Sequence, residues 1–452
     1  MQTDSKELFS KTPVVKLFFI AAIPGMISML TACIYSIVEG AFIGQFLGGP
    51  SFAAQNLAMP FVMIVFAMAD LIGVGSSVQI SIALGKKDEA RANGLFSMSV
   101  LLIFVMATLM GLLMFFIAPP LLRVLGAEGE THRLAVNYLR VYAIGAPICC
   151  FTFAMDNFLR ISGFIRGSMC LNIFMSGLNI GLLTLLIPIL DMDITGAALA
   201  SAASFATCAT IAFIPFLRKK AVLRLTKPLF ELSAIRSIVV CGMPVFLSNI
   251  AGRLAAIIMN VALLQVGGDL AVSAFGVLMY SGDFAMPILY GMNDSLQPAI
   301  GYNWGAGDTK RVKAIAKCVF TASGIASLVI AAVLYFLSRP VVSIFVAAEE
   351  TALMEMADGA LKLYATSMLV RWFGFGTQCF HSAIEKPLEA SVLSVSAALV
   401  FPLLTLALLW PMGLDGLWLN NTGTYLMMGI LAFFLLRRTL RAIRRIEQEK
   451  SV

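Results

Sequence analysis

The chain repeats its own landmarks at a constant spacing. The matched pairs are Pro24 and Pro244, Asp88 and Asp308, and Gly196 and Gly416, and the members of each pair are 220 positions apart. A fixed offset between landmarks this far apart indicates a duplicated unit, here of about two hundred residues. Both copies are strongly apolar, so we expect the duplicated unit to be a membrane bundle. Two related bundles commonly build a carrier that opens alternately to two sides of a membrane, which makes transport the first hypothesis.

The composition supports a membrane protein. Sixty per cent of the 452 residues are hydrophobic and 13% are charged, far from the usual makeup of a soluble domain. A helix that crosses a bilayer needs roughly 20 apolar residues, and twelve stretches meet this requirement. They span about 14–38, 52–84, 94–117, 134–155, 168–188, 194–217, 235–264, 270–302, 316–337, 360–382, 390–410 and 416–436. The sequence therefore predicts an all-α integral membrane protein with twelve transmembrane helices in two pseudo-symmetric six-helix lobes.

The repeat also sets the predicted domain boundaries. Residues 1–217 are expected to form an N-terminal lobe with helices 1–6, and residues 218–236 a basic cytoplasmic linker. Residues 237–452 are expected to form a C-terminal lobe with helices 7–12 and a basic tail. An even number of spans per copy makes the two copies parallel, related by an axis along the membrane normal.

The distribution of Lys and Arg predicts the orientation in the membrane. With both termini in the cytoplasm, 25 of the 32 basic residues fall in or beside cytoplasmic segments. Such an excess is typical of cytoplasmic loops. The sequence thus predicts a multi-pass protein of the cell membrane with both ends inside. The net charge of +7 is a consequence of this topology and does not indicate binding to nucleic acid.

Few residues are suited to catalysis or to metal binding. The eight cysteines lie in or beside apolar segments without metal-ligand spacing, and the only histidines are His132 and His381. No nucleotide-binding loop is present in the sequence. We therefore expect no enzyme activity, metal or cofactor, and energy from an ion gradient or a passive process.

Several local sequences resemble the multidrug and toxic compound extrusion (MATE) family. The most specific is Gln297-Pro298 followed by Gly301-Tyr-Asn-Trp-Gly-Ala-Gly-Asp308; others are Pro24 with the segment 34–44, Asn179-Ile180, and the segment 196–201. The resemblance covers residues 16–438 and implies two lobes around a central V-shaped cavity. It also implies a monomer in the lipid bilayer that exports amphipathic, often cationic small molecules in exchange for H⁺ or Na⁺.

Three residues of the first copy match the positions through which bacterial branches of the family couple transport to ions. Glu39 stands where those branches carry Asp in helix 1, Asn179 matches the Asn of helix 5, and Ser201 matches a small hydroxyl residue of helix 6. The Asp expected four residues after Asn179 is Leu183 here. A carboxylate in a low-dielectric site favours its neutral form, so Glu39 is a candidate to bind and release a proton. The other interpretation is a wetted residue near a helix end.

Pro24 and Pro244 fall early in helices 1 and 7. Proline removes a backbone donor and clashes with the preceding turn, so it bends a helix. A bend near Glu39 would connect ion binding to the shape of the cavity. A static kink required by packing is the alternative.

The second copy carries charges within its apolar segments. Arg253, Asp283 and Arg371 are counted to similar depths of helices 7, 8 and 10. Charges at a membrane depth are costly unless they pair or face a cavity. Two interpretations stay open, a structural cluster of ion pairs and a second binding surface that recognises anionic groups on a substrate.

Candidate cavity-lining residues lie on helices 1, 2, 7 and 8, and these are Tyr35, Met63, Asn260 and Gln297. Methionine is flexible and polarizable, which suits a cavity that accepts varied ligands. Ordinary packing is the alternative.

The leading functional hypothesis is a secondary active antiporter that exports amphipathic, cationic organic compounds. One rival is a flippase for a lipid-linked precursor, favoured by Arg253 and Arg371 and disfavoured by Glu39 and the twelve spans. The other is an exporter of one specific metabolite.

Overall fold

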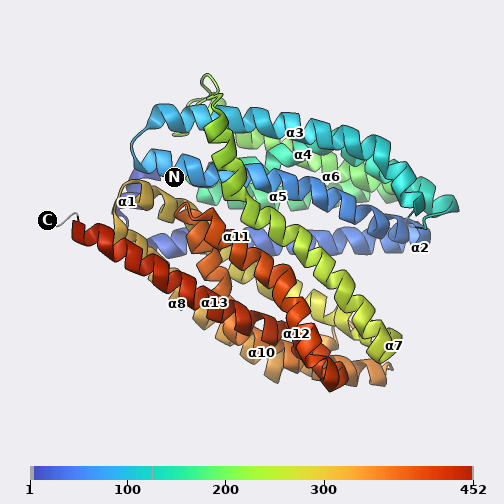
Figure 1. Cartoon of the computed structure of the whole chain (residues 1–452). Helices are drawn as coiled ribbons and strands as arrows, with labels where there is room; N and C mark the ends of the chain where they lie inside the picture. The colour runs from blue at the N-terminus through green and yellow to red at the C-terminus, as the bar shows by residue number, and fades with distance from the viewer. Residues whose placement is uncertain (1–4, 125, 348, 450–452) are drawn as a thin grey trace. The chain divides into compact units, whose positions relative to one another are not determined.

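The computed structural model describes residues 5–124, 126–347 and 349–449, and within these ranges it contains helices and no strand. The first half of the sequence forms α1 (Ser5–Lys11), α2 (Val14–Gly85), α3 (Glu89–Val124), α4 (Gly129–Ile161), α5 (Ile165–Thr184), η1 (Leu185–Ile189) and α6 (Ile194–Leu217) (Figure 1). The second half forms α7 (Leu232–Gly305), α8 (Thr309–Phe336), α9 (Ser338–Val342), α10 (Thr351–Ala383), α11 (Pro387–Val395), η2 (Ser396–Val400), α12 (Phe401–Leu409), η3 (Trp410–Met412) and α13 (Gly413–Glu449).

The longest helices, α2 and α7, each consist of two helices joined at a single glycine. Gly48 in α2 has φ 78° and ψ −177°, and Gly268 in α7 has φ 65° and ψ −162°. This backbone conformation is open to glycine and strongly unfavourable for residues with a Cβ. Gly268 follows Gly48 by 220 positions, so the sequence repeat recurs in the backbone geometry.

The helices account for the expected number of membrane spans. Eight helical stretches among the described residues are long and apolar enough to cross a membrane. Three of them, α2, α7 and the stretch from α11 to α13, contain two consecutive spans, and α10 is a further long helix. The described residues therefore contain twelve span-length helices, which confirms the predicted all-α membrane fold.

Contacts along the chain define two compact units. Unit 1 contains Ile27–Gly242 together with the N-terminal residues up to Thr12. Unit 2 contains Pro13–Met26 and the residues from Met243 onward. The chain thus passes from one unit to the other inside α2 and again inside α7. The predicted domain boundaries, with a linker at residues 218–236 between the two lobes, stay a prediction from the sequence.

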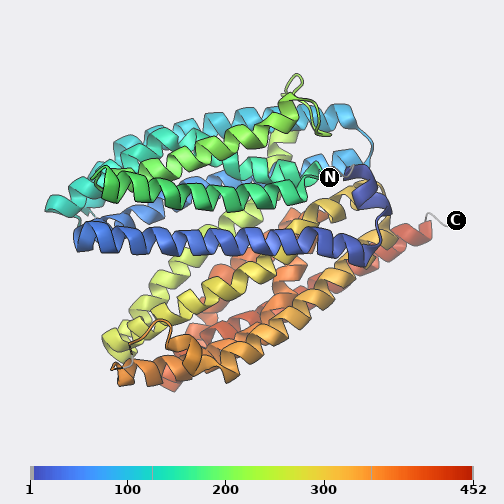
Figure 2. The same ribbon diagram turned by 180° about the vertical axis from the view of Figure 1, so that it is seen from behind.

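Each unit is a bundle with its own core. In unit 1, α4 packs against both α3 and α6, and α5 packs against α6 (Figures 1 and 2). The rings of Phe96 and Phe158 meet there with centroids 5.1 Å apart. In unit 2, α10 packs against both α8 and α13, and α12 packs against α13. These bundles hold the candidate functional side chains in place.

The repeat is also visible in two close helix crossings. In unit 1, a Cβ on Gly242 would lie 1.8 Å from the carbonyl oxygen of Leu71. In unit 2, a Cβ on Gly291 would lie 2.5 Å from the backbone nitrogen of Met26. Gly291 is the position 220 residues after Leu71. In both units the start of one long helix therefore crosses the second arm of the other at backbone contact.

The loops after α2 and α7 end in the same way. Asp88 accepts a hydrogen bond from the backbone nitrogen of Arg91 at 2.9 Å, and Asp308 accepts one from Arg311 at 2.9 Å. A side-chain oxygen in this position caps a helix N-terminus. The matched residues of the repeat thus start α3 and α8 with the same capping interaction.

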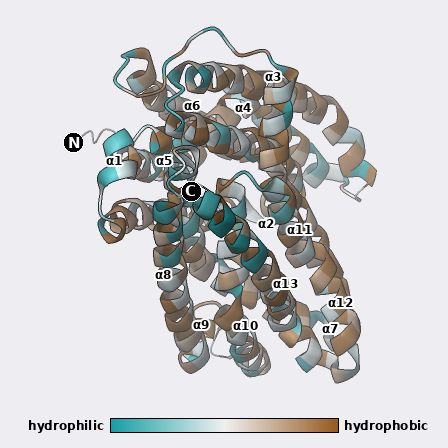
Figure 3. Cartoon of the chain, turned by 60° about the vertical axis from the view of Figure 1, so that its left-hand side comes forward, coloured by the Kyte–Doolittle hydropathy of each residue, from teal (hydrophilic) through white to brown (hydrophobic). Residues whose placement is uncertain are grey.

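Apolar side chains cover much of the surface. Exposed examples are Leu109, Phe116, Leu408 and Phe434. In Figure 3 most helices are brown, and teal residues gather on α1 and on the last turns of α13. Apolar helices whose backbone bonds are satisfied internally are what a bilayer accommodates. The protein is a multi-pass membrane protein.

Candidate functional site

Unit 1 buries one carboxylate in the middle of an apolar helix. Glu39 lies on the first arm of α2, and only 2% of its surface is exposed. Gly40 and Gly44 follow it, and the ring of Phe52 packs beside both.

The structure brings the three sequence-predicted coupling residues together. Ser201 on α6 donates a hydrogen bond from Oγ to Oε1 of Glu39 at 3.2 Å. Asn179 on α5 donates from Nδ2 to Ser201 Oγ at 2.9 Å. Ser201 and Asn179 are almost fully buried, with exposures of 0% and 2%. The three residues come from three helices and form one hydrogen-bonded chain.

Tyrosines complete this cluster. The hydroxyl of Tyr35 lies 3.5 Å from Ser201 Oγ, so this candidate cavity-lining residue is part of the Glu39 cluster. The rings of Tyr138 and Tyr142 on α4 lie with their centroids 5.0 Å apart in a tilted arrangement, and both tyrosines interact electrostatically with Glu39. Neither was predicted from the sequence, although two tyrosines four residues apart within an apolar helix are a recognisable signal.

The neighbours of Glu39 are polar but uncharged. Among the described residues, no Lys, Arg or His nitrogen lies within 4.0 Å of its carboxylate. Two buried oxygens in the same unit, Asn179 Oδ1 and Tyr138 OH, have no hydrogen-bond partner in the described structure. A buried charge that is not paired is costly. This arrangement therefore suits a carboxylate that is neutralised by an added cation.

Unit 2 contains a polar cavity of about 560 Å³. Its lining comes from both arms of α7 and from α10, η2, α12 and α13. Cavities of this size are typical of small-molecule sites. Arg253, Asp283 and Arg371, the three charges predicted in the second copy, all line it. Arg253 and Asp283 are exposed within the unit and Arg371 is half-buried.

Tyrosines hold the guanidinium of Arg371. Its Nη2 donates a hydrogen bond to the hydroxyl of Tyr290 at 3.2 Å, and its Cζ lies 4.3 Å from the ring centroid of Tyr425. Stacking on an aromatic face suits the planar guanidinium and stabilises its charge. Neither tyrosine was predicted from the sequence, because they lie 81 and 54 positions from Arg371 and no local pattern links them.

The other candidate cavity-lining residues lie elsewhere. Gln297 on α7 is half-buried, donates to Asp294 Oδ1 at 2.8 Å and borders a space of about 10 Å³, too small for a ligand. Met63 is half-buried on α2 and Asn260 is exposed on α7. Neither belongs to the lining of the 560 Å³ cavity.

Pro24 and Pro244 lie inside continuous helices close to the passages between units. Pro24 is on α2, two residues before the passage at Met26, and Pro244 is on α7, one residue after the passage at Met243. Ser394 donates a hydrogen bond to the carbonyl oxygen of Pro244. Their predicted role in helix bending stays a prediction.

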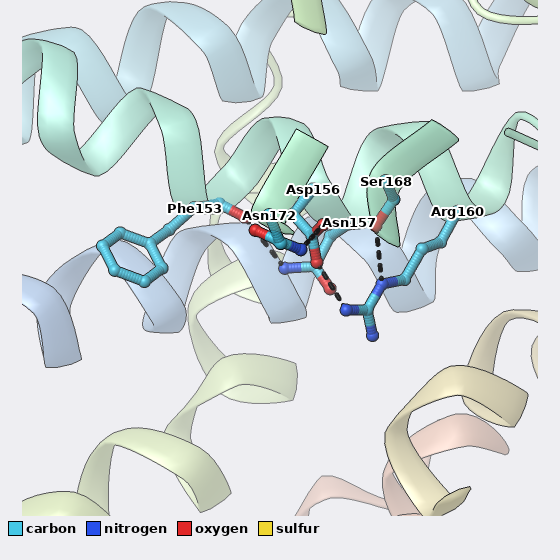
Figure 4. A network of polar contacts seen from close by, with 6 residues as sticks. All are labelled: Phe153, Asp156, Asn157, Arg160, Ser168 and Asn172. Atoms are coloured by element: carbon cyan, nitrogen blue, oxygen red, sulfur yellow. Dashed lines mark hydrogen bonds and ion pairs between the residues drawn. The ribbon is translucent and has the colours of Figure 1, made fainter. Parts of the chain in front are cut away.

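Unit 1 also contains a buried ion pair that was not predicted as a site from the sequence (Figure 4). On α4, Arg160 Nη2 lies 2.7 Å from Asp156 Oδ2. Asn172 on α5 donates to Asp156 Oδ1 at 2.9 Å, and Ser168 contacts both Asp156 and Arg160. The spacing of four residues fits a pair on one helix face. This network ties α4 to α5.

Comparison with known proteins identifies the family. The MatE family model matches residues 24–185 and 244–406, one match in each copy of the repeat. The chain belongs to the MatE family. Members of this family are membrane transporters, so the protein is a transporter and not an enzyme.

Relatives and solved structures agree over nearly the whole chain. The multidrug export protein MepA of Staphylococcus aureus is 28% identical over 409 residues, 89% of each chain. A MATE crystal structure in complex with MaL6 superposes with a TM-score of 0.93 at 23% identity, covering 98% of this chain and all of that one. A MOP-superfamily transporter from Pyrococcus furiosus, described as having a binding pocket of reversed polarity that suggests a different function, gives a TM-score of 0.91 at 23% identity, covering 98% and 99%. These structures establish the fold.

Proposed function

We propose that this MatE-family transporter exports amphipathic, cationic organic compounds in exchange for H⁺, and that Glu39 takes up the exchanged proton. Its similarity to a multidrug export protein over 89% of the chain supports the export of varied small molecules. The excess of basic residues in alternate loops supports a location in the cell membrane with both termini in the cytoplasm.

The observation that carries this proposal is the setting of Glu39. Its carboxylate is buried, receives a hydrogen bond from Ser201, and has no basic partner within 4.0 Å among the described residues. Charged side chains inside a membrane commonly mark proton and ion pathways. A proton bound to this carboxylate neutralises its charge.

We take H⁺ as the coupling ion, with Na⁺ as the alternative. Ser201 donates its one hydroxyl proton to Glu39 and accepts from Asn179. A proton needs only the carboxylate of Glu39, whereas a hard metal cation needs several oxygen ligands at once. Asn179 Oδ1, which has no hydrogen-bond partner in the described structure, is the oxygen that would serve Na⁺ beside Glu39. The two ions are separated by imposing each gradient in turn.

The prolines offer a route from proton binding to transport. Pro24 lies on the same arm of α2 as Glu39, near the passage between units. A helix interrupted by proline lacks one backbone hydrogen bond and bends more easily. In this proposal, protonation of Glu39 changes the bend at Pro24, and Pro244 is the matching site on α7.

The test is ethidium transport in proteoliposomes with either a pH gradient or a sodium gradient imposed. We expect the pH gradient alone to drive transport by the wild type, and Glu39→Gln to stop it. Glu130→Gln is the matched control, because Glu130 is an exposed carboxylate of the same unit. Transport that ignores the pH gradient, or normal pH-driven transport by Glu39→Gln, would refute the assignment.

A further inference from the structure

Arg371 of unit 2 and Arg160 of unit 1 differ in whether they have a carboxylate partner. Arg160 has a carboxylate partner, Asp156, at 2.7 Å. Among the described residues, no Asp or Glu oxygen lies within 4.0 Å of Arg371. Its contacts include the hydroxyl of Tyr290, the ring of Tyr425 and the side chain of Tyr364. These groups position the guanidinium but carry no compensating charge.

A guanidinium in this setting is poised to receive an anion. An arginine within a membrane helix is costly unless it faces a cavity or a partner, and Arg371 lines a cavity of about 560 Å³. Its planar fork of donors matches a carboxylate or phosphate in two parallel hydrogen bonds. The ring of Tyr425 restrains the plane of the fork, so less entropy is lost when the ligand binds.

The charges around the cavity favour one anionic group. Its charged lining residues are Arg253, Asp283 and Arg371, so two positive charges stand against one negative charge. Asp283 interacts electrostatically with Arg253. Asp283 thus partly offsets the positive charge of Arg253, and the net positive charge of the cavity lining is that of Arg371.

The rest of the lining fits an apolar body with a few polar groups. Apolar side chains from three helices line it, namely Met259, Phe275, Met279, Phe375 and Met428. Amide side chains are also present, namely Asn249, Gln378, Asn420 and Asn421. The walls thus combine apolar surface with many polar groups, which suits a small organic ligand that has both an apolar body and a polar or charged group.

We propose that the cavity of unit 2 binds an amphipathic organic anion, with its single anionic group held by Arg371 and its apolar body against the methionine and phenylalanine side chains. This inference extends beyond the proposed export of cations. It does not depend on Glu39, because every residue it uses belongs to unit 2.

The test uses three fluorescent probes that share one dansyl group and differ in charge. Dansylglycine is anionic, dansylamide neutral and monodansylcadaverine cationic. Binding to the full chain is measured at equilibrium in phosphatidylcholine nanodiscs, without an ion gradient. We expect dansylglycine to bind about tenfold or more tightly than dansylamide, the gain typical of a hydrogen bond to a charged group. Monodansylcadaverine reports cation binding by the rest of the chain, and we expect its affinity not to fall in Arg371→Gln.

Substitutions assign this preference to the cavity. Arg371→Gln is expected to make dansylglycine bind no better than dansylamide, and Arg371→Lys to keep part of the preference because the charge remains. Asp283→Asn is expected to tighten dansylglycine binding severalfold by removing the opposing charge. Arg438→Gln is the matched control, because it removes an exposed arginine of the same unit that lies outside the cavity lining.

The source of the anion is resolved by a second lipid composition. Nanodiscs with phosphatidylglycerol lower the apparent affinity for dansylglycine if an acidic lipid headgroup occupies the site, and leave it unchanged if the ligand is a free acid; both results support an anion site. Equal binding of dansylglycine and dansylamide by the folded wild type would overturn the proposal. So would an Asp283→Asn variant that binds dansylglycine no more tightly, a result that does not require Arg371→Gln to fold.

Discussion

The two units carry the charges of their apolar helices at different positions of the repeat. The acid Glu39 of unit 1 is matched by the apolar Met259 in unit 2. Conversely, Asp283 and Arg253 of unit 2 are matched by the uncharged Met63 and Cys33 in unit 1. The breaks at Gly48 and Gly268 and the caps at Asp88 and Asp308 are nevertheless shared. Duplication preserved the backbone while each copy acquired ionisable groups at different positions.

This difference indicates which features the fold requires. The close helix crossings and the aspartate caps recur because both copies need the same close approach and the same helix starts, although the glycines at the crossings, Gly242 and Gly291, match Ala22 and Leu71 in the first copy. The ionisable groups inside the apolar helices, Glu39, Arg253 and Asp283, do not recur, so packing alone does not explain them. Groups that differ between two copies of one fold are the ones for which a functional explanation is needed.

The largest expected effect comes from moving the acid between the two copies. The double variant Glu39→Met with Met259→Glu keeps the composition and exchanges the two positions. We expect it to lose nearly all pH-driven ethidium transport in proteoliposomes, because the carboxylate is then separated from Ser201 and Asn179. Recovery of transport would show that either unit can couple transport to protons, and would contradict the conclusion that the two units have different roles.

Removal of the two arginines should affect stability unequally. Arg160→Leu leaves Asp156 without its ion-pair partner, and breaking a buried pair costs about 3–5 kcal/mol, less here because Asp156 is partly exposed. Arg371→Leu strands no carboxylate, so we expect a smaller loss. Thermal unfolding in one detergent gives the order. A larger loss for Arg371→Leu would mean that its role is structural and would contradict the anion site.

The two glycine crossings should be equally sensitive. Gly242→Ala in unit 1 and Gly291→Ala in unit 2 each place a Cβ against the backbone of another helix, and such overpacking costs about 1–3 kcal/mol. Gly276→Ala on α7 is the control, because a Cβ there meets nothing within 4 Å. Thermal unfolding should show similar losses at the two crossings and none at the control. A loss at only one crossing would break the equivalence of the two units.

The smallest effects are expected at the caps. Asp88→Ala and Asp308→Ala each remove one side-chain hydrogen bond to a helix N-terminus, which costs about 1 kcal/mol. Chemical unfolding monitored by helical circular dichroism is the measurement. Clearly unequal losses would show that one of the two loops has taken on an additional role.

The parts of the structure that could be predicted from sequence follow from periodicity and spacing. The apolar stretches and the 220-residue offset predicted the helices and the repeat, because both depend on local composition. The family resemblance selected Glu39, Asn179 and Ser201, which the structure brings together. Contacts between distant residues were not predictable: nothing in the sequence near Arg371 indicates Tyr290 or Tyr425. The Asp156–Arg160 pair is the exception, since its four-residue spacing was visible and was not used.

The passages of the chain between units have a consequence for how the protein assembles. Pro13–Met26 belongs to the first half of the sequence and packs within unit 2, and the start of α7 up to Gly242 packs within unit 1. A polypeptide that ends in the connection between α6 and α7 would therefore lack the start of α7, which is part of the unit 1 bundle. The other half-length polypeptide would contain this segment without the helices against which it packs. Each half thus depends on the other to complete its bundle, and an ancestral single-copy protein of this design would have completed its bundle with the matching starting segment of a second copy.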